Sequence, residues 1–144
     1  MNATRWFRPT PLSPRASAGV LFLRIVAGSA FVLHGYGKIR NPFGWMGPEA
    51  AVPAVFQALA AVSEFFGGMA WIAGLLTPLA SLGIACTMAV AVYTHAAVLR
   101  DPFVAMQGGR SWELAAAYFC VAALLLLAGP GRFSADRVVF GEKN

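Results

Sequence analysis

Charged side chains are scarce in this chain of 144 residues. Asp, Glu, Lys and Arg make up 12% of the residues, against about 25% in ordinary soluble domains, whereas 58% of the residues are hydrophobic. The net charge of +5 does not form a basic stripe with interleaved aromatic residues, so the sequence does not predict nucleic-acid binding. Basic residues that flank long apolar runs instead predict an integral membrane protein, whose first partner is the lipid bilayer.

Cysteine is also rare, with only Cys86 and Cys120 present. We expect them at a similar depth in two apolar segments but on different faces, which predicts small apolar fillers and not a redox disulfide. The sequence contains no Cys/His metal-site spacing, no Gly-rich phosphate loop and no nucleophile triad. It therefore predicts no metal site, no covalently bound cofactor and no catalysis by this chain without a partner subunit.

Long apolar runs make up most of the chain. A helix needs about 20 residues to cross a hydrocarbon core. Four runs are close to that length, near residues 18–37, 54–76, 78–98 and 111–128. The first run contains Arg24 and precedes three more, so we interpret it as a retained helix and not as a signal peptide. The predicted fold class is all-α, a four-helix transmembrane bundle.

The sequence predicts one membrane domain between two short tails. The domains are a basic, Pro-rich tail at 1–16, the four-helix membrane domain at 17–131 and a short C-terminal tail at 132–144. Four crossings place both tails and the second connection on one side, which carries six Lys and Arg residues against four on the other side. Because cytoplasmic segments are enriched in Lys and Arg, we expect a multi-pass protein of the cytoplasmic membrane with both termini in the cytoplasm.

Two stretches resemble each other, "HGYGKIRNPFGWMG" from His34 and "HAAVLRDPFVAMQG" from His95. Each has a His near the end of an apolar run, then Arg, then Asn or Asp, then Pro-Phe and Met. Because the first and third runs cross in the same direction, the bundle would contain two parallel helical-hairpin repeats. Alternatively, Asn-Pro and Asp-Pro simply end helices while Phe and Met lie at the interface. Both interpretations remain open.

Five ionisable side chains lie within the apolar runs: Arg24, His34, Glu64, His95 and Glu113. A charge at the bilayer centre costs roughly 2.5–3.5 kcal/mol, so Glu64 should face protein and hold a partner. At 1.5 Å per residue, Arg24 and Glu64 differ in depth by about 5 Å, which the arginine stem can span. We therefore predict a structural Arg24–Glu64 ion pair, with a functional role left open. Small residues on the same helix faces would allow close approach: Gly28, Gly35, Gly67 and Gly68.

The other three groups, His34, His95 and Glu113, are expected within about 5 Å of the outer surface. We predict that they form one shallow cluster above the ion pair and are the candidate catalytic residues. Each also has a structural explanation, because a His is common at a helix end and a carboxylate in a first helical turn is favoured by the helix dipole. Convergence at one depth from different helices is what indicates a site.

The sequence resembles the DoxX family of small four-helix membrane proteins. The resemblance rests on "LFLRIVAGSAFVLHGYGKI", "SEFFGGMAWIAGLLTPLAS", "CTMAVAVYTH", "GGRSWELAAAYF" and "AGPGRFSAD", which together reach from about residue 20 to Asp136. Polar residues stand where the family pattern places them: Arg24, His34, Lys38, Glu64, His95 and Glu113. The Arg-Trp-Phe-Arg segment near the N-terminus is outside that pattern.

The resemblance implies a bundle in the cytoplasmic membrane and a link to quinone-coupled redox chemistry. Family members resemble the small subunit of a thiosulfate:quinone oxidoreductase, and others associate with oxidative-stress or thiol-handling systems. This implies redox-partner subunits, and the sequence is also compatible with a homo-oligomer.

Three functional hypotheses follow. In the first, the chain is a quinone- or small-hydrophobe-binding subunit of a membrane redox complex, in which the two His bind the head group and Glu113 relays protons. The ligand-binding residues would be Lys38, Phe43, Trp45 and Phe103. In the second, the chain is a membrane anchor, assembly module or small transporter without chemistry of its own. The third, a bis-His haem between His34 and His95, ranks lowest.

Overall fold

The computed structural model describes residues 6–9, 11–50 and 52–141, and these residues form helices and contain no strand. The elements are α1 (Pro14–Ile39), α2 (Ala54–Ala73), α3 (Thr77–Tyr93), the π-helix η2 (Thr94–Val98), α4 (Glu113–Ala128) and α5 (Ala135–Phe140). By length and composition, α1, α2 and the continuous Thr77–Val98 segment can each cross a membrane. The shorter apolar α4 has 16 residues, or about 24 Å. The all-α prediction is confirmed, and the arrangement is consistent with a four-helix membrane bundle.

Local sequence signals explain where these helices begin and end. α1 begins at Pro14, four residues earlier than predicted, because the Ser13 side chain accepts a hydrogen bond from Ala16 N at 3.2 Å and Pro14 suits the first helical position. α2 ends at Ala73, and its C-cap residue Gly74 takes a left-handed conformation with φ of 65°. A short turn then leads into α3 at Thr77-Pro78, as predicted.

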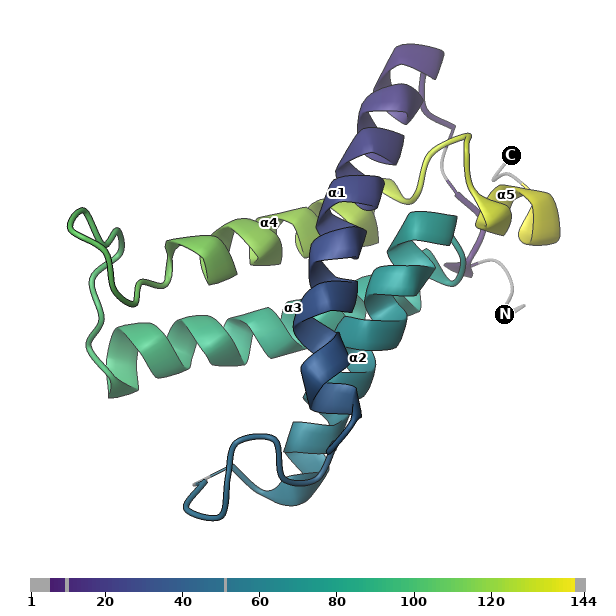
Figure 1. Cartoon of the computed structure of the whole chain (residues 1–144). Helices are drawn as coiled ribbons and strands as arrows, with labels where there is room; N and C mark the ends of the chain where they lie inside the picture. The colour runs from purple at the N-terminus through teal and green to yellow at the C-terminus, as the bar shows by residue number, and fades with distance from the viewer. Residues whose placement is uncertain (1–5, 10, 51, 142–144) are drawn as a thin grey trace.

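The helices form two antiparallel hairpins, α1–α2 and α3–α4, which we call the first and second hairpins. Figure 1 shows that they meet near the α2–α3 turn and diverge from there, so the 40–53 connection and the 99–112 connection lie far apart. We call the part that holds the α2–α3 turn, α5 and the described N-terminal residues the terminal end. The parts that hold the two long connections are the loop ends of the hairpins. A hairpin arrangement agrees with the repeat hypothesis but does not test whether the halves are duplicates.

Glycine brings α1 and α2 into close contact, as the small residues predicted. A Cβ on Gly68 would lie 2.7 Å from Gly28 O, and a Cβ on Gly35 would lie 2.5 Å from Phe65 N. A residue with a Cβ at either position would clash with the other helix, so the glycines determine where α1 and α2 can approach this closely and thus set the register of the first hairpin. Gly67 serves another contact, because a Cβ there would meet Ile84 of α3 at 3.1 Å.

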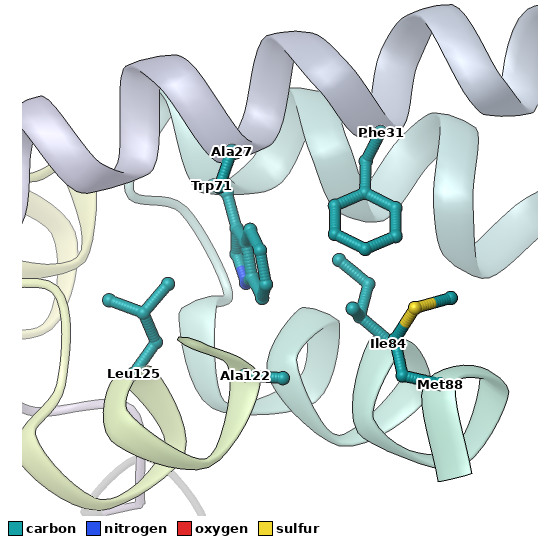
Figure 2. Packing of buried hydrophobic residues seen from close by; sticks show 7 residues of the cluster. All are labelled: Ala27, Phe31, Trp71, Ile84, Met88, Ala122 and Leu125. Atoms are coloured by element: carbon teal, nitrogen blue, oxygen red, sulfur yellow. The ribbon is translucent and has the colours of Figure 1, made fainter. Parts of the chain in front are cut away.

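A small apolar core joins the two hairpins near their crossing. Figure 2 shows its seven buried residues: Ala27, Phe31, Trp71, Ile84, Met88, Ala122 and Leu125. The Phe31 ring packs edge-on against Trp71 with centroids 5.4 Å apart, and Trp71 Nε1 donates a hydrogen bond to Ser81 Oγ at 3.0 Å. This bond satisfies the indole N–H inside the core. Many remaining apolar side chains are exposed on the helices, as expected where lipid is the solvent.

Two peripheral predictions need adjustment. The segment after residue 131, predicted as a tail, contains α5 and the fully buried Asp136, so part of it belongs to the packed structure. Near it, the Phe7 and Phe140 rings stack with centroids 5.3 Å apart. Cys86 and Cys120 are free thiols exposed on the helix surfaces, so they are not fillers of the core.

Candidate functional site

Arg24 is buried at the terminal end, where it binds four backbone carbonyl groups. Its Nε donates to Trp71 O at 2.7 Å and its Nη2 to Ile72 O at 3.1 Å, both in the last turn of α2. Its Nη1 donates to Pro130 O at 2.6 Å and to Phe133 O at 2.9 Å. The last carbonyls of a helix lack intrahelical partners and carry partial negative charge, so a guanidinium is a favourable ligand for them. Arg24 thus connects α1, α2 and the chain after α4.

Asp136 completes this connection from α5. Its two carboxylate oxygens accept hydrogen bonds from Leu76 N at 2.6 Å and Thr77 N at 2.9 Å, at the start of α3. Its own backbone N–H donates to Gly74 O at 2.8 Å. The carboxylate therefore caps α3 and also balances the charge of Arg24. We call Arg24, Asp136 and the 130–133 turn the clasp.

Glu64 is paired with Lys38 and not with Arg24, so the predicted Arg24–Glu64 ion pair is wrong. Lys38 Nζ lies 2.6 Å from Glu64 Oε1 and 2.7 Å from Oε2. The physical reason is the helix register, because depth along each helix does not fix how two helices align, whereas the Gly28–Gly68 contact does. Trp71, whose carbonyl binds Arg24, stands seven residues beyond Glu64 in α2, or about 10 Å along its axis.

The 40–53 connection closes over this ion pair. The Lys38 ammonium lies 4.4 Å from the centre of the Trp45 ring, a cation–π contact, and Trp45 Nε1 donates to Gln57 O at 2.9 Å. The buried Gln57 side chain bonds to two points of this connection. Its Oε1 accepts a hydrogen bond from Met46 N, and its Nε2 donates one to Val52 O. The Glu64 side chain is 3% exposed and that of Lys38 24%. The hydrogen bonds of this pair are satisfied within the protein, which indicates a structural role.

His95 forms a second polar centre at the loop end of the second hairpin. Its Nδ1 lies 2.7 Å from Asp101 Oδ2, and Arg110 Nε lies 3.5 Å from the same oxygen. An ionised carboxylate only accepts hydrogen bonds, so Nδ1 must carry the proton and Nε2 becomes the acceptor of the neutral ring. The His95 side chain is 31% exposed. The pair therefore presents an oriented imidazole at the surface of the hairpin.

The backbone around His95 is unusual for a helix end. η2 is a π-helix, and Arg100 has φ of 56°, which is uncommon for a residue with a side chain. The Asp101 N–H bonds back to His95 O at 2.8 Å, which keeps the carboxylate beside the ring. Short π-helices and strained residues are frequent where a side chain must be positioned for function. The sequence signal for this geometry is weak, because an Asp-Pro pair is also typical of an ordinary helix end.

Aromatic rings and an apolar groove lie next to this centre. Phe103 and Trp112 pack with ring centroids 4.4 Å apart, and Glu113 N donates to Phe103 O at 3.0 Å. A groove of about 420 Å³ runs between α3 and α4, and Val92 of its lining stands one turn before His95. The lining is almost wholly apolar: Ala89, Val92, Tyr93, Ala116, Phe119 and Cys120.

The structure does not bring the predicted cluster of His34, His95 and Glu113 together as one group. His95 and Glu113 both belong to the loop end of the second hairpin, whereas His34 is exposed on α1. Equal depth implies proximity only for parallel helices, and Figure 1 shows the two hairpins diverging toward their loop ends. The same divergence removes the geometric basis for a haem between the two His.

The predicted ligand-binding residues are divided in the same way. Phe43, which is 64% exposed, and Trp45 belong to the first connection, and Phe103 belongs to the second, so they do not line one common pocket. Lys38 is already occupied by Glu64. Two residues that prediction missed, Asp101 and Asp136, are the acids that organise the second loop end and the terminal end. Their roles depend on contacts across turns, which periodicity and composition do not reveal.

The helices and buried charges define a multi-pass membrane protein of the four-helix type. The DoxX family profile matches residues 19–97, more than half of the chain, and the chain belongs to the DoxX family. It is 31% identical over 142 residues to an uncharacterized protein of Haemophilus influenzae, an alignment that covers 97% of this chain and 98% of that protein. No solved structure matches the chain.

Proposed function

We propose that this protein binds a quinone, or a small hydrophobic molecule with a similar polar ring, as a subunit of a redox complex in the cytoplasmic membrane. The observation that carries the proposal is the His95–Asp101 pair, whose Nδ1 and Oδ2 atoms lie 2.7 Å apart. His95 stands one turn after Val92, which lines an apolar groove between α3 and α4. Ligand sites typically combine an apolar lining with a few oriented polar groups. The family resemblance to quinone-linked membrane proteins supports the choice of ligand.

The chemistry required of this chain is limited to hydrogen bonding and proton transfer. Neutral His95 accepts a hydrogen bond from a quinol hydroxyl at Nε2, and the protonated ring donates one to a quinone carbonyl. Asp101 orients the ring through its contact with Nδ1, and Arg110 pairs with the same carboxylate oxygen. Glu113 is exposed at the start of α4 and would relay protons between this end and water. Electrons would enter or leave through a redox centre of a partner subunit.

The test compares three variants of the full chain, two at the proposed site and one control, purified in an uncharged detergent. Binding of a short-chain ubiquinone is followed by quenching of tryptophan fluorescence, with Trp112 beside the site. We expect His95→Gln and Asp101→Asn each to weaken binding about tenfold, the loss of one well-placed polar contact. His34→Gln is the matched control, since His34 is exposed on the first hairpin, and should bind like the wild type. Equal binding by the two His variants would refute the proposal.

The second candidate is an assembly module that organises partner proteins without chemistry of its own. The observation that favours it is that Arg24, Lys38 and Glu64 are engaged within the protein, while large apolar side chains cover the outside of the helices. Its test is recovery of partner proteins with the tagged chain from membranes. Loss of partners with Glu64→Ala, together with unchanged partners and quinone binding in His95→Gln, would favour assembly.

A further inference from the structure

The terminal end carries basic side chains without acidic partners. Arg8 and Arg15 are exposed and Arg132 is partly exposed. Among the residues that the structure describes, Asp136 is the only acid at this end, and both of its oxygens are already bound to the start of α3. We call Arg8, Arg15 and Arg132 the basic patch. Its positive charge is therefore not neutralised by the part of the chain that is described.

Arg132 contains a donor that lacks an acceptor. Its backbone N–H binds Ser17 Oγ at 3.2 Å, which anchors the residue on α1. Its side-chain Nε is buried and has no hydrogen-bond partner among the described residues. A buried donor without a partner is costly, and a guanidinium is suited to phosphate through paired N–H···O bonds. Arg132 as a whole is only partly buried, so a rotation of its side chain would bring the guanidinium to a phosphate oxygen at the surface.

The terminal end also exposes apolar side chains. Phe133 is 52% exposed, Val138 86% and Val139 62%, and Trp6 near the N-terminus is 49% exposed. α5 thus turns Asp136 inward and two valines outward. Basic residues beside apolar and aromatic side chains are typical of elements that lie at the boundary of headgroups and acyl chains.

We infer that the terminal end binds the phosphate headgroup of an anionic phospholipid through Arg132, with Arg8 and Arg15 adding attraction. The site lies on the clasp itself, because Arg132 stands between Pro130 and Phe133, the two residues of the turn whose carbonyls bind Arg24. A bound headgroup would hold this turn, and with it Ser134 and Asp136, in place. The lipid is then a ligand that stabilises the junction of the two hairpins. This inference does not depend on quinone binding at the other end.

The experiment is a lipid titration of the full chain in an uncharged detergent, with bound lipids counted by native mass spectrometry. We expect phosphatidylglycerol to bind more tightly than phosphatidylcholine. Removing one surface arginine should weaken phosphatidylglycerol binding about fivefold, since each such charge contributes on the order of 1 kcal/mol near a membrane surface. Arg132→Gln should show this loss, and Arg132→Lys should retain part of the binding through its charge. Arg40→Gln, an exposed arginine at the loop end of the first hairpin, is the matched control and should bind like the wild type.

Two further measurements keep the inference open to refutation. The thermal midpoint of each variant without lipid shows whether it is folded, and phosphatidylglycerol should raise the midpoint of the wild type more than that of Arg132→Gln. Glycerol phosphate is added in parallel, and an equal effect would identify a site for free phosphate and overturn the assignment to lipid. Equal binding of the two lipids, or an Arg132→Gln variant with wild-type affinity, would also overturn it.

Discussion

Replacement of Asp136 by Ala is the sharpest test of the clasp. The substitution removes the acceptors of Leu76 N at 2.6 Å and Thr77 N at 2.9 Å, and with them the cap of α3. Thr77 is fully buried, so water cannot replace the lost acceptor there. Arg24 keeps its four carbonyl partners but loses the balancing negative charge.

The magnitude follows from these contacts. A hydrogen bond to a charged group contributes about 1.5–3 kcal/mol, and we assign that range to the buried Thr77 N–H. The Leu76 N–H belongs to a partly exposed residue, so we assign about 0.5–1 kcal/mol to it. Asp136→Ala should therefore lower the free energy of unfolding by about 2–4 kcal/mol. Asp136→Asn keeps one oxygen and should lower it by roughly half as much.

Unfolding would be measured in mixed micelles titrated with dodecyl sulfate and followed by tryptophan fluorescence, to which Trp71, buried in the core, contributes. Val138→Ala is the control on the same helix, because Val138 is 86% exposed and its truncation should change stability by no more than about 0.5 kcal/mol. If Asp136→Ala is as stable as Val138→Ala, the carboxylate does not fasten α5 to the α2–α3 turn and the clasp is refuted.

Two further predictions concern the first hairpin. Glu64→Ala should destabilise the protein by about 3–5 kcal/mol in the same titration, because it leaves the ammonium of Lys38 without its carboxylate. A double Glu64→Leu/Lys38→Met variant should recover most of that loss. If it recovers none, the assigned pairing is contradicted. Gly68→Ala should cost about 1–3 kcal/mol, since its methyl group would lie 2.7 Å from a backbone oxygen of α1. Gly37→Ala, which meets nothing within 4 Å, should be neutral or slightly stabilising, so equal losses at both glycines would show that close packing is not what sets the register.

The two loop ends show how similar sequence segments acquire different chemistry. His95 has Asp101 beside it, six residues later in the chain. The residue that corresponds to Asp101 in the first hairpin is Asn41, which is uncharged and lies seven residues after His34. No hydrogen bond of the His34 side chain occurs among the described residues. In the first hairpin the polar contacts instead gather on Lys38 and Glu64, beneath Trp45. The proposed ligand site is therefore assigned to one half of the protein.

Composition and periodicity determined the class of this protein. Long apolar runs interrupted by Gly, Pro and clustered charges predicted the helices to within a few residues, because the bilayer requires each spanning segment to satisfy its own backbone. The need for buried charges to find partners was also apparent from the sequence, as was the close contact at Gly28 and Gly68.

The identity of the partners was decided by tertiary structure. Arg24 binds carbonyls at the end of α2, Glu64 binds Lys38, and His95 binds Asp101. Each of these choices depends on where two helices cross, how a turn folds back or how far two hairpins diverge. Counting residues along a helix measures depth in one dimension only, whereas a shift of one or two turns between neighbouring helices exchanges one ionic partner for another.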